Sequence, residues 1–143
     1  MPKLEIKIKR VHADAKIPIY ATEGSAGCDF YSVEEIIIAP HETRKIKTGI
    51  SVEIPSGYFI RLEGRSGLSA KGILKAGGVI DSDYRGEIHI VLYNSTPEMF
   101  KIEKGDRIAQ GVVTPIMQAS FNEVNELSQT TRGEGGFQST GIK

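Results

Sequence analysis

Alternation of apolar and polar residues constrains the fold of this chain more than any other feature of its sequence. Successive side chains of a β-strand point to opposite faces, so a run with a period of two buries one face and exposes the other. Each such run, and each short β-branched run, predicts a strand. These runs occupy residues 4–8, 36–38, 46–54, 58–62, 88–92 and 108–116. Pro115 favours an end or an edge of the last strand.

Turn-forming residues separate these runs at short intervals. They stand at residues 23–25, 40–41, 55–57, 95–97 and 104–106. Many short strands with turns between them are typical of a β-sandwich or barrel, and only residues 66–71 favour a helix, of one or two turns. No linker or internal repeat divides the 143 residues, so we expect a single all-β domain.

Composition excludes several classes of partner. Lys plus Arg balances Asp plus Glu at 18 each, so bulk charge favours neither nucleic acid nor a membrane surface. The start of the chain does not form a signal peptide, and no stretch approaches the ~18 apolar residues that span a bilayer. Cys28 is the single cysteine, which excludes an internal disulfide and suits a reducing, cytoplasmic location.

Residues 128–143 differ in composition from the rest of the chain. They contain four glycines and two apolar side chains, Phe137 and Ile142. Such a segment cannot bury enough apolar surface to offset the entropy lost on ordering. We therefore expect a domain at residues 1–127 and a flexible C-terminal arm, which is either a disordered tail or becomes ordered on a ligand or partner.

Five glycine-rich or polar segments interrupt the strands and hold the residues that could carry chemistry. They are residues 24–30, 64–68, 77–87, 105–110 and 132–141. Arg65 and Arg132 can bind phosphate oxygens through two N–H groups each, and Ser66 and Gly67 can bring backbone N–H groups close to an anion. These groups favour a phosphate-bearing ligand, and together with the acidic and aromatic residues of the same segments they suggest a nucleotide.

Carboxylates and aromatic rings complete the set. Asp29 and Asp81 could bind a hard cation or activate water, and Tyr84 and Phe137 could stack on a base or sugar. Taken alone, each has a simpler explanation: Asp81 as a turn residue, Tyr84 as a half-buried strand residue. The three histidines show no metal-ligand spacing, and P-loop, dinucleotide-binding and Gly-x-Ser-x-Gly motifs are absent from the sequence.

All five segments, in this order, resemble the five motifs of the trimeric dUTPase family over residues 21–141. The most specific are Gly-Val-Ile-Asp-Ser-Asp-Tyr-Arg-Gly-Glu at 78–87 and Arg-Gly-Glu-Gly-Gly-Phe at 132–137. The resemblance implies a distorted jelly-roll β-barrel of the β-clip type and a homotrimer with active sites between subunits. It also implies that the arm at 128–143 closes over a site formed by neighbouring subunits.

The same resemblance implies an activity: Mg²⁺-dependent hydrolysis of dUTP to dUMP and pyrophosphate, which supplies dUMP for dTMP synthesis and keeps uracil out of DNA. Asp81 is then the catalytic residue that orients and deprotonates the water attacking the α-phosphorus. Asp29 helps to hold hydrated Mg²⁺ through water, while the triphosphate itself supplies most of the metal's ligands.

The remaining carried-over residues are implied to bind substrate. Residues 78–80 lie along the uracil pocket, Tyr84 lies under the deoxyribose and excludes a 2′-hydroxyl, and Phe137 covers the uracil. The others contact phosphates, with Arg132 at the distal one. The implied set is Arg65, Ser66, Gly67, Gly78, Val79, Ile80, Tyr84, Gln110, Arg132, Phe137, Gln138, Ser139 and Thr140.

A few positions depart from the family pattern, and two other functions stay open. Gly64 replaces a usual Pro, Gln138 a usual Gly, and Cys28 and Phe30 replace a commoner Tyr and Leu. The alternatives are a dCTP deaminase or bifunctional deaminase–diphosphatase of the same fold, and a non-catalytic trimeric β-barrel binding protein. The spacing of Tyr84 from Asp81 and the arm's Arg and Phe favour the dUTPase.

Overall fold

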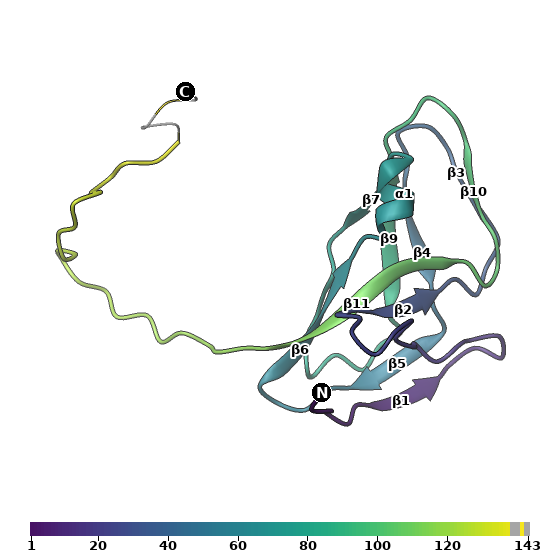
Figure 1. The fold of residues 1–143 in the computed structure, drawn as a ribbon, viewed down its shortest axis with the longest axis horizontal. Coiled ribbons are helices and arrows are strands. Elements are labelled where there is room, and N and C mark those ends of the chain that lie inside the picture. The colour runs from purple at the N-terminus through teal and green to yellow at the C-terminus, as the bar shows by residue number, and fades with distance from the viewer. Residues whose placement is uncertain (138–140, 142–143) are drawn as a thin grey trace.

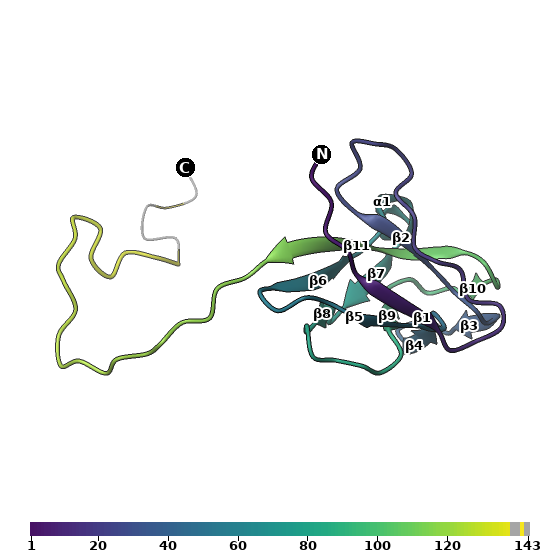
Figure 2. The same ribbon diagram turned by 90° about the horizontal axis from the view of Figure 1, so that it is seen from below.

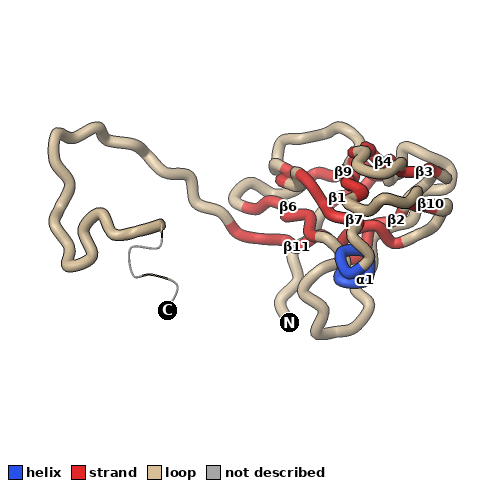
Figure 3. The backbone as a smooth tube through the Cα atoms, turned by 90° about the horizontal axis from the view of Figure 1, so that it is seen from above, coloured by secondary structure: helices blue, strands red, loops and turns tan. Residues whose placement is uncertain are grey.

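A computed structural model describes residues 1–137 and 141 of the chain. Within these residues the strands β1–β11 and one helix, α1, form an all-β body (Figure 1; helix and strands are separated by colour in Figure 3), which confirms the predicted fold class. In chain order, the elements are β1 (Lys7–Arg10), β2 (Cys28–Tyr31), β3 (Ile36–Ile38), β4 (Thr43–Lys47), β5 (Ile50–Glu53), β6 (Tyr58–Glu63), α1 (Ser66–Ala70), β7 (Ile73–Ala76), β8 (Val79–Ile80), β9 (His89–Asn94), β10 (Phe100–Ile102) and β11 (Arg107–Pro115).

The strands form small antiparallel sheets around one hydrophobic core, in a distorted jelly-roll arrangement. Their orders are β2-β11-β6-β8, β4-β9-β7, β1-β5 and β10-β3. Burial in β9 follows the predicted alternation, with Ile90 and Leu92 in the core and Val91 half-buried. The positions of the apolar residues in the alternation therefore decide which face of each longer strand points into the core.

Residues 46–54 do not form the single strand that their alternation predicts. β4 ends at Lys47 and β5 begins at Ile50, and the two strands belong to different sheets. Gly49 makes the turn with φ +69°, and a Cβ built on it would lie 2.8 Å from Cβ of both His12 and Ala15. Ile46 and Ile50 stay buried on either side of the turn, so the alternation continues although the strand does not.

Two other predicted strands are more exposed than their sequences indicate. Ile37 is exposed, because β3 pairs with β10 in a sheet of two strands and one face of it is open. In β1, which begins at Lys7 and pairs with β5, all four residues are exposed, including Ile8. The predicted helix is found as α1, one residue shorter than expected. No helix among the described residues is long and apolar enough to cross a membrane.

After β11 the chain leaves the barrel and extends away from it (Figures 1 and 2). The N–H of Ile116 still bonds to the carbonyl of Gly57 at 2.9 Å. Residues 117–134 are all exposed, among them Met117 and Phe121. The chain's own barrel therefore leaves these large apolar side chains uncovered.

Replacement of Gly49 by alanine should lower the free energy of unfolding by about 2–5 kcal/mol. The left-handed conformation costs an L-residue roughly 1–2 kcal/mol, and overpacking against His12 and Ala15 adds about 1–3 kcal/mol. Urea unfolding at one fixed protein concentration measures the loss. Gly24→Ala is the control, because a Cβ there meets no atom within 4 Å. Equal stability of the two variants would contradict the role of Gly49.

Candidate functional site

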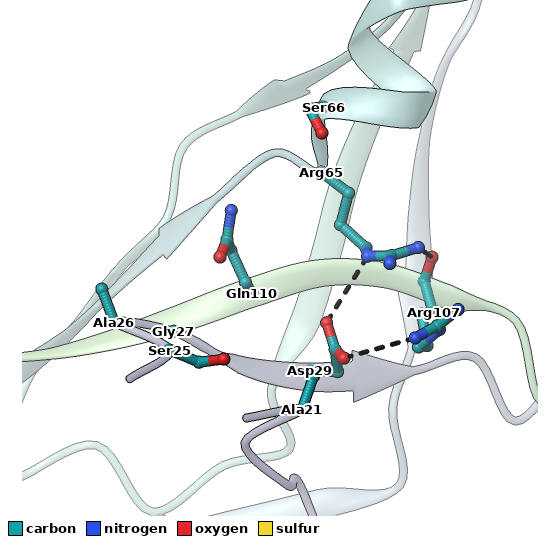
Figure 4. A pocket seen from close by; sticks show the side chains of 9 residues that line it. All are labelled: Ala21, Ser25, Ala26, Gly27, Asp29, Arg65, Ser66, Arg107 and Gln110. Atoms are coloured by element: carbon teal, nitrogen blue, oxygen red, sulfur yellow. Dashed lines mark hydrogen bonds and ion pairs between the residues drawn. The ribbon is translucent and has the colours of Figure 1, made fainter. Parts of the chain in front are cut away.

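Three of the five sequence segments meet in one open cavity of about 260 Å³, shown in Figure 4. The register of β11 brings them together: Gln110 lies opposite Asp29 of β2 on one side and opposite Glu63 of β6 on the other. The chain after β6 then leads directly into α1. The lining residues are Ala21, Ser25, Ala26, Gly27, Asp29, Arg65, Ser66, Arg107 and Gln110.

Asp29 lies between two arginines at the base of this cavity (Figure 4). Its Oδ1 is 3.4 Å from Nε of Arg65, and its Oδ2 is 3.8 Å from a terminal nitrogen of Arg107. The Asp29 side chain is 12% exposed, so the two guanidinium groups compensate a largely desolvated charge. One carboxylate against two guanidinium groups leaves an excess positive charge, which favours an anionic ligand.

Gln110 links the two sides of the cavity. Its Nε2 donates to the carbonyl of Gly64 at 3.1 Å. On the other side, a Cβ on Gly27 would lie 2.7 Å from Oε1 of Gln110, so the amide packs directly over a glycine backbone. This hydrogen bond is accepted by the backbone carbonyl of residue 64, which glycine and proline both have. Glycine in place of the family's usual proline therefore leaves the bond intact.

Two further departures from the family pattern lie on the core side of β2. Phe30 is 1% exposed, and a Cβ on Gly111 would lie 2.6 Å from its ring. Cys28 is buried, and its thiol donates to the carbonyl of Gly111 at 3.5 Å. Burial raises the pKa of the Cys28 thiol, so it stays protonated and is a poor nucleophile. These substitutions change core packing, while Asp29 between them faces the cavity.

Arg107 is a charged residue of the cavity lining that was not predicted from the sequence. It lies in the fourth segment, three residues before Gln110, and that proximity was the available signal. Its contact with Asp29 depends on an irregularity in the pairing of β11 with β2 between Arg107 and Ala109. A one-residue shift of this kind has no recognisable sequence pattern.

The residues of the second segment, 64–68, do not all contribute to the cavity. Arg65 and Ser66 line the cavity, with Ser66 the first residue of α1, whereas Gly67 is absent from the lining. Arg65 also donates from a terminal nitrogen to the carbonyl of Arg107 at 3.5 Å. A guanidinium carries five N–H groups, and these contacts use only part of that capacity.

The third segment lies apart from this cavity. Asp81 and Tyr84 are exposed and do not line it. The loop that carries them closes on itself: the N–H of Tyr84 bonds to the carbonyl of Asp81 at 3.2 Å, and its hydroxyl donates to the carbonyl of Glu87 at 2.8 Å. Arg85 donates to the carbonyl of Ser82 at 2.7 Å. One chain by itself does not bring the predicted catalytic carboxylate to the arginine pair.

The start of the third segment is fixed against β6. The carbonyl of Gly78 accepts the N–H of Leu62 at 2.7 Å, and Gly78 has φ +116°. A Cβ there would lie 2.9 Å from the carbonyl oxygen of Leu62, so this close approach requires glycine. Val79 is exposed and the side chain of Ile80 is buried.

The fifth segment lies on the extended part of the chain (Figure 1). Arg132 donates through Nε to the carbonyl of Gly135 at 2.7 Å, and the N–H of Gly133 bonds to the hydroxyl of Thr130 at 3.1 Å. Phe137 is fully exposed, with φ +50°. The other predicted arm contacts, Gln138, Ser139 and Thr140, lie outside the described residues.

In the described part of the chain, protein side chains alone do not form a complete metal-binding site. No group of three or more His, Cys, Asp or Glu side chains among the described residues could hold an ion. Mg²⁺ in proteins often takes one or two carboxylates and completes its shell with substrate phosphates and water. The single carboxylate Asp29, beside a cavity suited to an anion, fits a magnesium ion of that kind.

Comparison with known proteins gives consistent matches. The model of the dUTPase family matches residues 13–141. The deoxyuridine 5′-triphosphate nucleotidohydrolase of Nautilia profundicola is 48% identical over 141 residues, covering 96% of this chain and 99% of that protein. That of Zymomonas mobilis is also 48% identical, over 145 residues and 98% and 99% of the two chains.

Solved structures agree with these relatives. The Staphylococcus bacteriophage 80alpha dUTPase with dUPNHPP has a TM-score of 0.92 and 31% identity, covering 98% of this chain and 100% of that one. A mutant dUTPase from phage phi11 of S. aureus, whose structure reveals the coordination of a structural Mg(II) ion, has a TM-score of 0.83 and 26% identity over 88% of this chain and 100% of its own.

Proposed function

This chain belongs to the dUTPase family and hydrolyses dUTP to dUMP and pyrophosphate with Mg²⁺; on that premise we propose which of its residues bind the substrate and which perform the reaction. The assignment of the phosphate-binding residues rests on one observation: Arg65 and Arg107 flank Asp29 in the cavity. In a chain without net charge, this local excess of positive charge is where the triphosphate binds.

The active form is a homotrimer in which each site combines residues of different subunits. One observation supports this: the loop of Asp81 and Tyr84 does not line the cavity of its own chain. Large apolar side chains are also exposed on the N-terminal segment and on the extended C-terminal segment, among them Leu4, Ile8, Met117 and Phe121. Burial of such residues between subunits would stabilise the assembly.

Hydrolysis then proceeds by in-line attack of water on the α-phosphorus, with pyrophosphate as the leaving group. Asp81 orients the water and accepts its proton. Arg65, Arg107 and Ser66 contact phosphate oxygens, with the backbone of Gly67 and the amide of Gln110 at the same end of the substrate. When bound, Mg²⁺ neutralises charge on the triphosphate, and Asp29 is the residue that would hold it through water.

Base and sugar are read by the third segment. Backbone groups of Gly78, Val79 and Ile80 pair with the uracil edge, which rejects cytosine because mismatched buried polar groups stay unpaired. Tyr84 packs its ring under the deoxyribose. Because its hydroxyl is already bonded to the carbonyl of Glu87, the ring has a fixed position from which to exclude a 2′-hydroxyl.

The arm at 128–143 closes over the bound nucleotide. Arg132 contacts the distal phosphate, and Phe137 covers the uracil. Gln138, Ser139 and Thr140 supply further phosphate contacts. Ordering of a glycine-rich segment costs conformational entropy, so closure is favourable only when the ligand offers these contacts in return. We place the reaction in the cytoplasm, where a buried lone thiol such as Cys28 stays reduced.

The substrate assignment predicts that dUTP alone is turned over efficiently among closely related nucleotides. Pyrophosphate release should be faster with dUTP than with dTTP, dCTP or UTP by about 10²-fold or more, because a site built for hydrogen bonds to one base rejects others strongly. A coupled pyrophosphate assay measures the rates. Ammonia release from dCTP would instead indicate a deaminase, and binding of dUTP without pyrophosphate release would indicate a binding protein.

Replacement of Asp81 by asparagine should reduce kcat for dUTP by about 10²–10⁴-fold, the usual contribution of a general base. Binding of dUTP, measured by calorimetry, should persist because Asp81 acts on the water and not on the nucleotide. Asp83→Asn in the same exposed loop is the matched control and should retain near wild-type turnover. Unchanged turnover in Asp81→Asn would show that another residue is the base.

Truncation after Thr131 should lower kcat/KM for dUTP by about 10²-fold or more, because the closed site loses Arg132 and Phe137. Light scattering should find the same assembly as in the full chain, since the strands of the barrel end at Pro115. Truncation after Gly141, which keeps every proposed contact, provides the comparison. Full activity after removal of residues 132–143 would contradict a role for the arm.

A further inference from the structure

Glu87 connects the loop of Asp81 and Tyr84 to the barrel through its carboxylate. Its Oε2 accepts the backbone N–H of Gly49 at 2.7 Å, and its Oε1 lies 3.1 Å from Nε2 of His89. The side chains of Glu87 and His89 are 22% and 25% exposed. Water therefore competes with these hydrogen bonds less than it does at the surface, and both carboxylate oxygens have a partner.

The backbone of the same residue holds the ring of Tyr84. The carbonyl of Glu87 accepts the Tyr84 hydroxyl at 2.8 Å. The Tyr84 ring packs so closely on Gly86, the residue before Glu87, that a Cβ on Gly86 would lie 2.6 Å from Cζ of Tyr84. The position of the ring is therefore set by the backbone at residues 86 and 87.

Gly49, the backbone partner of the carboxylate, is itself well fixed. Gly49 occupies the turn between β4 and β5, where its carbonyl accepts the N–H of Val11 at 2.8 Å. The next loop residue, Ile88, is held independently of the carboxylate: its N–H bonds to Ile50 at 2.7 Å and its carbonyl accepts the N–H of Thr48 at 3.3 Å. The carboxylate thus restrains Glu87 itself, one residue before Ile88, and Glu87 is the residue whose carbonyl Tyr84 contacts.

The loop's other link to the barrel is weaker. A terminal nitrogen of Arg85 lies 3.7 Å from a carboxylate oxygen of Glu53, and these side chains are 54% and 48% exposed. Exposed pairs of this kind contribute little, because solvent screens them and both side chains lose freedom. Glu87 is the better anchored of the two links.

We infer that Glu87 is a positioning residue for sugar specificity: bonded to Gly49 and His89, it holds its own carbonyl, and through it the Tyr84 ring, where a 2′-hydroxyl would clash. The inference rests on the proposed function, in which Tyr84 lies under the deoxyribose. A looser ring would admit a ribonucleotide, so the effect falls on UTP more than on dUTP.

The test compares kcat/KM for dUTP with kcat/KM for UTP in the full chain. The ratio of these two values is independent of how much of the enzyme is folded, because both substrates meet the same active molecules. In Glu87→Ala the dUTP preference should fall by ~10-fold, an effect of the size expected when charge-assisted hydrogen bonds are lost. In Glu87→Gln it should be largely retained, since the amide oxygen can still accept from Gly49 and its NH₂ can donate to His89.

Control variants separate this role from a general effect of charge or stability. Glu35→Ala removes a carboxylate that lies 3.1 Å from the Lys101 ammonium on the exposed surface, and it should leave the preference unchanged. His89→Ala removes one of the two partners of Glu87 and should lower the preference in the same direction, by less. It serves as the second variant if Glu87→Ala does not fold.

A double-mutant cycle tests whether Glu87 acts through Tyr84. Tyr84→Phe removes the hydroxyl bonded to Glu87 and should lower the preference; adding Glu87→Ala to it should lower it little further. Additive effects of the two substitutions would overturn the role of Glu87. An unchanged preference in Glu87→Ala and His89→Ala would do the same, and continued hydrolysis of dUTP in these variants would leave the proposed function intact. If the wild-type protein does not hydrolyse dUTP, the proposed function fails and this inference with it.

Discussion

The register of β11 between β2 and β6 is the constraint on which the cavity depends. It aligns Asp29, Gln110 and Glu63 on one face, and Cys28, Gly111 and Leu62 on the core face. A slip by one residue would exchange these faces. Such a slip would place a side chain where Gly111 now lies, and a Cβ on Gly111 would be only 2.6 Å from Phe30 and 2.9 Å from Ile60. Packing around one glycine therefore fixes the register, and the register brings the charges of the site together.

Charge in this site is organised locally, because the chain as a whole carries none in excess. Asp29 holds Arg65 and Arg107 in a cavity that would otherwise set two like charges against each other. On the proposed assignment, the triphosphate meets guanidinium groups that are already oriented, so less entropy is lost on binding. The same carboxylate is the one side chain lining the cavity that suits a hydrated Mg²⁺, so the proposed metal role of Asp29 adds to its structural role between the two arginines.

Sequence alone predicted the parts that depend on local pattern. The alternation identified the longer strands, such as β9, and glycine-rich segments identified the residues that meet at the cavity. It missed β2, β7, β8 and β10, which have two to four residues each and are too short for alternation to show. It also missed the break at Gly49 and the contact of Arg107 with Asp29. Both are consequences of packing and register between segments distant in sequence.

The separation of Asp81 from the arginine pair explains why its loop is built as it is. In the homotrimer that we propose, this loop completes a cavity on another copy of the chain, so contacts around that cavity cannot shape the loop before assembly. Hydrogen bonds replace that packing: Tyr84 to the carbonyl of Glu87 and Arg85 to the carbonyl of Ser82 within the loop, and the Glu87 carboxylate to Gly49 at its foot. The geometry that the proposed assembly needs between subunits is thus set inside one chain.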